Sequence, residues 1–166
     1  EMLQIIVEET NRLNTVVSQF LDYARPTRKA TKTATDINHV VERTMEVVRA
    51  DNPGCSAVLT RLSKNLPEVE TDPEQLRQVF LNLAQNALQA MGEGGSLTVS
   101  TKVTRGPGLK ASGIEGDKRR YIRIAFTDTG PGIPEEVRRN LFIPFYTTKE
   151  RGTGLGLALS LRIMKN

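Results

Sequence analysis

The first part of the chain carries mostly apolar residues at alternating spacings of three and four, the heptad spacing of a helix that packs along another helix. These positions are Leu3, Ile6, Thr10, Leu13, Val17, Phe20 and Ala24. Pro26 ends the pattern, because the residue before a proline is pushed out of the helical region. We therefore predict a long amphipathic helix over residues 1–26, whose apolar stripe packs on a partner helix or on its own domain.

Two further amphipathic helices are predicted downstream. Residues 27–35 are polar and basic without periodicity, as expected of a linker or a short edge strand. Asp36 then caps a helix whose apolar stripe is Ile37, Val40, Val41, Thr44 and Val48. The next helix has Asp72 as its N-cap, Pro73 at its first position and glycines from Gly92 at its end. Its predicted buried residues are Leu76, Val79, Phe80, Leu83, Ala84, Ala87 and Met91.

Strand patterns are interleaved with these helices. After an Asn-Pro-Gly turn, residues 57–62 are expected to form a short strand. Residues 97–103 and 121–126 alternate like the two strands of a hairpin. The glycine-rich, charged loop over 105–120 joins them, and we expect it to be mobile. Helices and strands that alternate in this way predict an α/β fold.

Composition limits the core and the partners. A chain of 166 residues with 38% apolar content has room for one core and a small appendage. Its apolar runs fall far short of the roughly 20 residues that a membrane-spanning helix needs, and no signal segment opens it, so we expect this chain to be cytoplasmic and without membrane contact, although a parent protein could still be membrane-anchored. The formal net charge of +4 favours anionic partners. Because aromatic and basic residues do not alternate, we expect no nucleic-acid binding.

The single cysteine and the single histidine are expected to have no chemical role. Cys55 has no second cysteine with which to form a disulfide or a cysteine-based metal site, which fits a reducing compartment. His39 lies in the first turn of the helix that Asp36 caps, and no metal-ligating residue or carboxylate stands beside it in a suitable pattern. We expect His39 to be a surface residue.

Three amide side chains project from one side of the helix that Asp72 caps: Asn82, Asn86 and Gln89. Asparagine is only a moderate helix former, so two of them in a well-formed amphipathic helix require an explanation. Either they are the solvent-facing side of the helix, or their amide oxygens coordinate a hard cation or a phosphate-bound water.

Asp128 ends the second hairpin strand and begins the segment DTGPGIP, which contains Gly130 and Gly132. A carboxylate at a strand end is suited to accept a hydrogen bond from an exocyclic amine, and the glycines let the backbone approach a flat ligand. The alternative is that the segment is a simple turn.

A second glycine segment, GTGLGLALS from Gly152, leads into an apolar helical run. The N–H groups at a helix start bind anions, although the spacing matches neither a Walker loop nor a dinucleotide fingerprint. Between the two glycine segments, Phe142 and Phe145 are expected to tether the chain to the core. Residues 147–149 could then form a lid over a polyphosphate, with Lys149 as a point charge for its terminal phosphate.

Taken together in this order, the segments resemble the ATP-binding domain of sensor histidine kinases, of the GHKL or Bergerat type. QVFLNLAQNALQAM resembles the N box, DTGPGIP the first G box, FIPFYTTK the F box and GTGLGLALS the second G box. EETNRLNTVVSQFLDYARP resembles the second helix of the family's dimerisation and phosphotransfer hairpin. The resemblance implies a two-layer α/β sandwich, with helices on one face of a mixed sheet, preceded by a long dimerisation helix.

The resemblance divides the chain into the hairpin helix over 1–26, a linker over 27–35 and the ATP-binding catalytic domain over 36–166. It implies that the phosphoacceptor histidine lies before Glu1 and that two strands follow Asn166, so we expect the sequence to be part of a longer kinase. That kinase would bind ATP and Mg²⁺, form a homodimer through its N-terminal helix, and transfer the γ-phosphate to a histidine for relay to a response regulator aspartate.

The resemblance also assigns roles to individual residues. Asn86 would hold the Mg²⁺ that bridges the phosphates, with Asn82 in support. Asp128 would read the adenine amino group, and Lys149 would meet the γ-phosphate, which makes Asn86 and Lys149 the implied catalytic residues. The other nucleotide-binding residues that it implies are Gln89, Gly130, Gly132, Ile133, Phe145, Thr148, Gly152, Thr153, Gly154, Leu155 and Gly156.

One position separates the subclasses of this family. Its ATP-hydrolysing members carry a glutamate four residues before the Mg²⁺-binding asparagine, where it activates water. Here Asn82 occupies that position, which favours phosphoryl transfer to a protein nucleophile. The alternatives are an ATPase of the same family, which would release phosphate steadily, and a nucleotide-binding or dimerising module without kinase activity, which would bind ATP without transfer.

Overall fold

The computed structural model describes residues 2–24, 31–52, 57–92, 94–105, 120–149 and 152–165. The chain forms two compact units. The sheet unit is Thr31–Gly132, and the helix unit combines Glu1–Ala30 with Ile133–Asn166. The division into hairpin helix, linker and catalytic domain stays a prediction. Cys55 and most of the predicted 105–120 loop lie outside the described residues.

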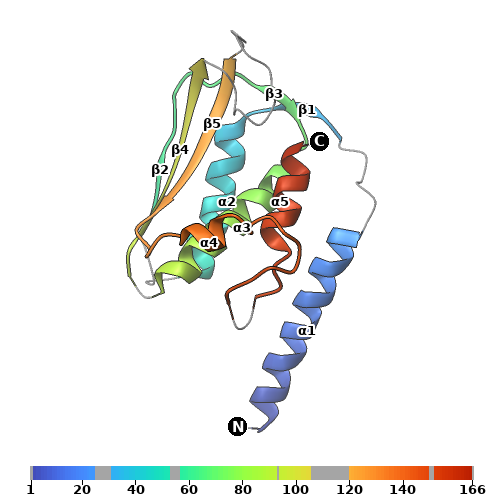
Figure 1. Cartoon of the computed structure of the whole chain (residues 1–166). Helices are drawn as coiled ribbons and strands as arrows, with labels where there is room; N and C mark the ends of the chain where they lie inside the picture. The colour runs from blue at the N-terminus through green and yellow to red at the C-terminus, as the bar shows by residue number, and fades with distance from the viewer. Residues whose placement is uncertain are drawn as a thin grey trace. The chain divides into compact units, whose positions relative to one another are not determined.

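Mixed strand pairing confirms the predicted α/β fold of the sheet unit (Figure 1). The strands of its main sheet are, in order, β2 (Ala57–Arg61), β4 (Ser96–Arg105) and β5 (Arg120–Asp128). β2 runs parallel to β4, and β5 pairs with β4 as the predicted antiparallel hairpin. A small antiparallel sheet joins β1 (Thr33–Thr35) to β3 (Val69–Thr71), and β3 was not predicted from the sequence.

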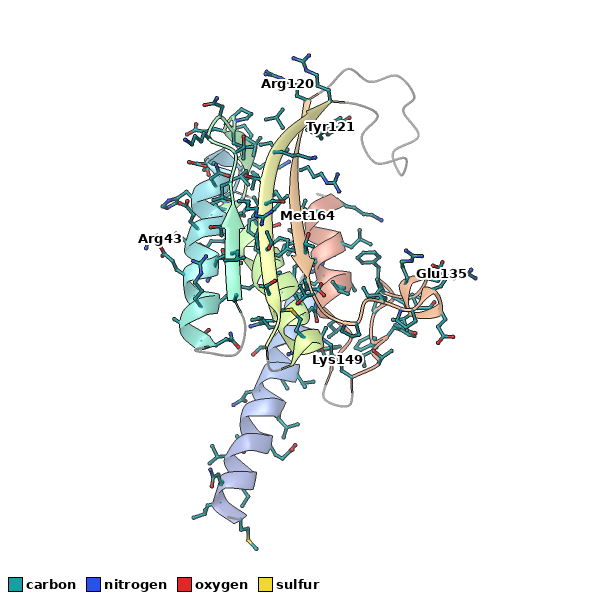
Figure 2. The ribbon with its side chains drawn as sticks, turned by 90° about the vertical axis from the view of Figure 1, so that its left-hand side faces the viewer. Arg43, Arg120, Tyr121, Glu135, Lys149 and Met164 are labelled. Carbon is teal, nitrogen blue, oxygen red and sulfur yellow. The ribbon has the colours of Figure 1, made fainter. Side chains whose placement is uncertain are left out.

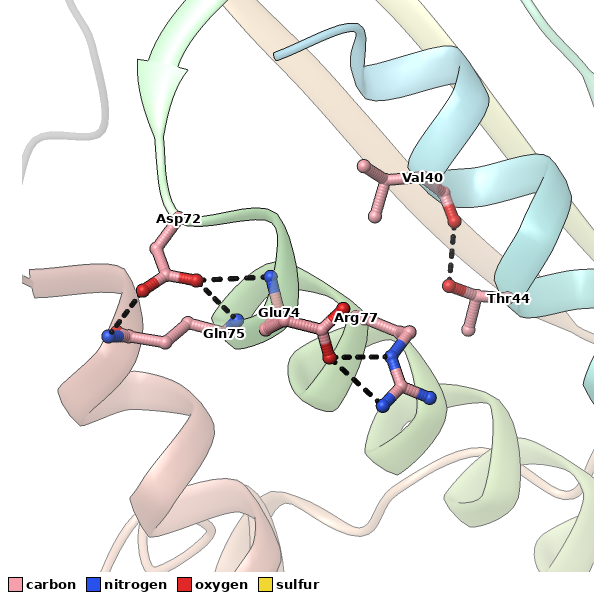
Figure 3. A network of polar contacts seen from close by, with 6 residues as sticks. All are labelled: Val40, Thr44, Asp72, Glu74, Gln75 and Arg77. Carbon is pink, nitrogen blue, oxygen red and sulfur yellow. Dashed lines mark hydrogen bonds and ion pairs between the residues drawn. The ribbon is translucent and has the colours of Figure 1, made fainter. Parts of the chain in front are cut away.

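Both helices of the sheet unit begin at the predicted N-caps. α2 is Ile37–Asp51, and the side chain of Asp36 accepts hydrogen bonds from the N–H groups of its first turn. α3 is Pro73–Met91, and the carboxylate of Asp72 accepts from the N–H groups of Glu74 and Gln75 at 3.1 and 3.2 Å. Figure 3 shows this cap, which also binds the Gln75 side-chain amide at 3.3 Å. Such a cap contributes about 1 kcal/mol to helix stability.

The core of the sheet unit consists of side chains from α2, α3 and one face of the main sheet. The rings of Phe80 on α3 and Phe126 on β5 lie 5.7 Å apart, and Val99 of β4 pairs with Phe126 in register. The prediction for α3 was wrong at Leu83 and Met91, which are only partly buried, because the buried stripe turns through Ala84 to Leu88. The residues with no more than 2% exposure in this unit are Ile37, Val41, Thr44, Met45, Val48, Phe80, Ala84, Leu97 and Val99.

A polar network joins the start of α2 to the sheet. The Asn38 side-chain amide donates to the carbonyl oxygen of Ser63 at 2.8 Å, and its oxygen accepts from the Thr101 hydroxyl at 2.8 Å. The same hydroxyl accepts from the N–H of Ser63 at 3.1 Å. Thr101 is 5% exposed, so its hydroxyl needs these partners. Within α2 itself, the buried Thr44 hydroxyl donates a hydrogen bond to the Val40 carbonyl oxygen at 2.6 Å (Figure 3).

The helix unit contains α1 (Met2–Ala24), α4 (Glu135–Arg138) and α5 (Gly156–Lys165). α1 confirms the long helix that was predicted from the heptad spacing. Its apolar stripe is exposed at Leu3, Ile6, Leu13, Val17 and Phe20, with exposures between 49% and 79%. No helix in the described part of the chain is long and apolar enough to cross a membrane.

The Asn38 network provides a test of the fold. We expect Asn38→Ala to lower the free energy of unfolding by about 1–3 kcal/mol, because it leaves the Thr101 hydroxyl and the Ser63 carbonyl without their partner. Urea denaturation measures the change. His39→Ala is the matched control: His39 is exposed on the same helical turn, and its removal should change stability by less than about 0.5 kcal/mol. Equal stability of the two variants would contradict the assigned role of the network.

Candidate functional site

The predicted amides lie on the side of α3 that faces away from its buried residues. Asn82 and Asn86 are half-buried and Gln89 is exposed. The amide nitrogen of Asn86 donates to the amide oxygen of Asn82 at 3.4 Å. This bond orients the Asn86 side chain so that its oxygen is the atom suited to a hard cation. No cluster of three or more His, Cys, Asp or Glu able to hold a metal occurs among the described residues.

Asp128 is the last residue of β5 and pairs with Leu97 of β4. Its carboxylate binds the backbone of the residues that follow it. Its Oδ1 accepts a hydrogen bond from the N–H of Gly130 at 2.9 Å. A Cβ atom added to Gly130 would lie 2.9 Å from that oxygen, so only glycine allows this turn without a shift. Asp128 is therefore exposed at the end of a strand. Its hydrogen bond with the N–H of Gly130 fixes the orientation of its carboxylate.

Thr129, which sequence reasoning did not single out, joins the Asp128 turn to two other elements. Its hydroxyl accepts from the N–H of Ser96, the first residue of β4, at 3.0 Å. The hydroxyl donates to the sulfur of Met91, the last residue of α3, at 3.5 Å. A Cβ atom on Gly95 would lie 2.8 Å from the same hydroxyl. The threonine in DTGPGIP carries no signal for this role, because its partners are distant in the sequence.

In the helix unit, two backbone segments meet at the base of the predicted lid. The N–H of Phe145 donates to the carbonyl oxygen of Gly154 at 3.2 Å. Both residues have positive φ, +66° and +68°. A Cβ atom on Gly154 would lie 2.7 Å from the nitrogen of Tyr146 and closer still to the carbonyl carbon of Phe145. We call this close approach between Phe145 and Gly154 the loop base.

The aromatic side chains do not anchor this segment as expected. Phe142 and Phe145 are 50% and 60% exposed, and Ile133 is also exposed, so the prediction that Phe142 and Phe145 tether the chain to the core was wrong. The loop base is instead held by the backbone bond at Phe145. The buried residue that follows it is Leu155, with 2% exposure.

Lys149 belongs to the segment between Phe145 and Gly154 (Figure 2). Its N–H donates to the Thr147 hydroxyl at 3.1 Å, and its carbonyl oxygen accepts from the N–H of Gly152 at 3.1 Å. The residue as a whole is exposed, as is Thr148, yet partial burial of its ammonium group lowers the pKa of Lys149 below the usual 10.5. Such an ammonium gains more than a fully hydrated one when an anion arrives.

The start of α5 supplies the features of an anion site. The Thr153 hydroxyl accepts from the N–H of Leu155 at 3.4 Å, just before the helix begins at Gly156. The first-turn N–H groups of any α-helix lack intrahelical acceptors, and the helix dipole adds partial positive charge there. The predicted phosphate loop therefore ends in the expected helix.

A hollow of about 310 Å³ lies beside the loop base in the helix unit. The side chains Val16, Val17, Phe20 and Leu21 of α1 line one part of it, and Phe145, Gly152, Thr153 and Leu155 line the rest. Part of the apolar stripe of α1 therefore faces the residues that close the loop.

Comparisons with known proteins agree with the boxes described above. The sequence profile of the family described as histidine kinase-, DNA gyrase B- and HSP90-like ATPase matches residues 71–166. The sensor histidine kinase ZraS of Escherichia coli O157:H7 is 36% identical over 167 aligned positions, which cover 99% of this chain and 33% of ZraS. The sensory histidine kinase/phosphatase NtrB of Salmonella typhimurium is 35% identical, over 99% of this chain and 45% of NtrB. The chain thus spans less than half the length of either relative.

Among solved structures, the histidine kinase ThkA, in a complex with the response regulator protein TrrA, superposes with a TM-score of 0.66. It is 25% identical to this chain, and the match covers 89% of this chain and 40% of ThkA.

The loop base yields a test that needs no ligand. We expect Gly154→Ala to break the Phe145–Gly154 bond, since the added methyl group would overlap the backbone at Phe145 and Tyr146. A local cost of about 1–3 kcal/mol would speed trypsin cleavage after Lys149 by roughly 5- to 100-fold. Gly132→Ala is the control: it also has positive φ, +78°, but a Cβ atom there meets nothing within 4 Å. Similar cleavage of both variants would contradict the close approach as the cause.

Proposed function

Because the chain belongs to the family of histidine kinase-, DNA gyrase B- and HSP90-like ATPases, we propose that it is the ATP-binding catalytic portion of a sensor histidine kinase. The observation that carries this proposal is the pairing, within one unit, of the oriented amides of α3 with the Asp128 turn at the end of β5. These two features have the chemistry to bind the two ends of a nucleotide.

Asp128 is proposed to recognise the purine. With Oδ1 engaged by the N–H of Gly130, Oδ2 is the oxygen positioned to accept from the 6-amino group of adenine. A carboxylate is an acceptor only, so it selects a donor at this place on the base. Gly130 and Gly132 are proposed to shape the adjacent wall, where side chains would obstruct a flat ring, and Ile133 and Gln89 to border it.

Asn86 is proposed to hold Mg²⁺, with Asn82 orienting its side chain. The donor set fits this ion: amide oxygens are hard ligands, and Mg²⁺ usually takes only one or two protein ligands alongside substrate phosphates and water. Bound there, the ion would offset the charge of the phosphate oxygens.

The helix unit is proposed to bind the triphosphate. The first-turn N–H groups of α5, from Gly156, would donate hydrogen bonds to phosphate oxygens. Gly152 and Gly154 keep the approach free of side chains, and Lys149 would place its ammonium on the γ-phosphate. The remaining implied contacts, from Phe145, Thr148, Thr153 and Leu155, belong to the same loop.

Phosphoryl transfer to a histidine, rather than to water, is the proposed reaction. A hydrolytic enzyme of this family type needs a base beside the metal site, and Asn82 cannot serve, because an amide does not take up a proton at neutral pH. Its oxygen is moreover occupied by the Asn86 amide. His39 is exposed on the first turn of α2, within the nucleotide-binding portion, and we assign it no acceptor role.

The proposed partners follow from this reaction. A second copy of the chain would cover the exposed stripe of α1, since an apolar heptad stripe is stable in water only against another helix. A response regulator would receive the phosphoryl group. The complex of the similar kinase ThkA with the response regulator TrrA supports this assignment.

ATP binding tests the proposal directly. By titration calorimetry, we expect the chain to bind ATP in the presence of Mg²⁺ and more weakly after EDTA treatment. Asp128→Asn should weaken binding by about 10- to 100-fold, the loss expected when a hydrogen bond to a charged group is removed. Asn86→Ala should abolish the benefit of Mg²⁺.

Glu70→Gln is the control for Asp128→Asn, because it makes the same change of charge at an exposed position on β3. It should leave ATP affinity unchanged. If a folded chain does not bind ATP, or binds it equally after Asp128→Asn, the proposed nucleotide site is wrong.

Lys149 makes ATP binding depend on pH in the alkaline range. Burial lowers the pKa of Lys149 in the free chain, and a bound γ-phosphate would raise it. At a pH between these two pKa values, Lys149 therefore takes up a proton when ATP binds. Affinity should be full below the lowered pKa and fall by up to about tenfold per pH unit above it. Lys149→Arg stays charged throughout and should remove this dependence. Calorimetry in two buffers of different ionisation enthalpy would detect the proton, and an identical pH profile for Lys149→Arg would exclude Lys149 as its source.

A further inference from the structure

We propose that Thr129 is a positioning residue that sets the chain's preference for a 6-aminopurine, by fixing the Asp128 turn to the last residue of α3 and the first residue of β4. The inference rests on the proposed nucleotide site, and concerns a residue that contacts Asp128 through the backbone. Its basis is the set of bonds that the Thr129 hydroxyl makes.

The first step concerns the end of the β4–β5 ladder. Leu97 and Asp128 are the last pair in register, so the next pair would be Ser96 and Thr129. The backbone leaves the ladder here, because the carboxylate of Asp128 binds the N–H of Gly130. The N–H of Ser96 therefore loses a ladder partner, and the Thr129 hydroxyl replaces it at 3.0 Å. The side chain lets the strand end at Asp128 without leaving a donor unpaired.

The second step concerns α3. The same hydroxyl donates to the sulfur of Met91 at 3.5 Å, and Met91 also packs beneath the turn. An added Cβ atom at Gly95 would lie 3.0 Å from the sulfur of Met91, so glycine at this position allows the close approach, whereas one at Gly130 would be in ordinary contact with Met91 at 3.5 Å. The end of the helix that carries Asn86 and the turn that carries Asp128 are thus in contact through one side chain.

The consequence is a restraint on the carboxylate. Rotation of the Asp128 turn would have to break the Thr129 bond to Ser96 as well as the bond to Gly130. A carboxylate held in one orientation distinguishes a purine that has a 6-amino donor from a purine that lacks it. A freely rotating carboxylate binds water instead. Thr129 should therefore affect discrimination between bases more than binding of the triphosphate.

The experiment compares ATP with purine riboside triphosphate, which is ATP without the 6-amino group, in titrations of the whole chain. Thr129→Val keeps the branched shape and removes the hydroxyl, while Thr129→Ser keeps the hydroxyl. We expect the ratio of the two affinities to fall by about 3- to 10-fold in Thr129→Val, the loss expected for one neutral hydrogen bond. Thr129→Ser should keep the ratio of the unaltered chain.

Each result separates the positioning role from a general effect on folding. If Thr129→Val weakens both nucleotides equally, or leaves the ratio unchanged, the inference is wrong, even though the site exists. If the unaltered chain binds both nucleotides equally, the proposed reading of adenine by Asp128 fails first. If it binds neither, the proposed function itself fails.

Amide hydrogen exchange supplies a test that does not depend on the folding of Thr129→Val. In the unaltered chain, the N–H groups of Ser96 and Gly130 should be protected, and ATP should slow their exchange more than purine riboside triphosphate does. Rapid exchange at Ser96, or an equal response to both nucleotides, would overturn the inference.

Discussion

The packing of α3 against the β4–β5 hairpin is the interaction on which the candidate site depends. Phe80 meets Phe126 in the core, and the helix buries one stripe of apolar residues against the sheet. A helix that is fixed along one side has no freedom to rotate, so its opposite side is fixed as well. This constraint aims Asn82 and Asn86 outward together. It also brings the last residue of the helix to the strand end at Asp128. The contact between the buried Phe80 and the half-buried Phe126 thus helps to determine where two polar groups of different elements lie.

The helix unit is constrained differently, because the phenylalanine side chains of its irregular loop are exposed and do not pack in a core. Its loop base relies on one backbone hydrogen bond between Phe145 and Gly154. A positive φ at a phenylalanine is unfavourable, by of order 1–3 kcal/mol, and persists only where the surroundings enforce it. Here the close approach of Gly154 enforces it. A loop whose base is held by a backbone contact of this kind, and not by buried aromatic side chains, is suited to change conformation as a lid over a ligand must.

Sequence patterns were sufficient for the elements whose causes are local. The caps at Asp36 and Asp72 follow from side-chain geometry within one turn, and both helices begin where these residues predict. The hairpin follows from alternation along each strand. The candidate residues on α3 were identifiable because asparagine is only a moderate helix former, and two of them stand four residues apart in a well-formed amphipathic helix. Whether these residues bind a nucleotide stays a prediction.

Sequence patterns were insufficient where a role depends on contacts between distant segments. β3 has three residues and pairs with β1, and so short a strand has no periodicity to detect. Exposure of Phe142 and Phe145 contradicted the rule that large aromatic residues anchor a loop, because here the backbone forms the anchor. The role of Thr129 was not predicted for the same reason, because its hydrogen-bond partners are 33 and 38 residues away in the sequence.

The neutral amide at Asn82 has a consequence for the chemistry as a whole. A carboxylate in that position would bring both a base and a negative charge close to the proposed Mg²⁺ and phosphates. The amide instead directs its oxygen to Asn86, so its contribution is orientation rather than proton transfer. In the proposed site, a nucleotide would be protected from attack by water, because the Asn82 amide cannot take up a proton from it. The γ-phosphate would then react only with a nucleophile that needs no activation by a base, as is the case for a neutral imidazole. The proposed site, built from amides, would therefore couple the use of ATP to the arrival of an acceptor, which is the property that a signalling kinase requires and an ATPase does not.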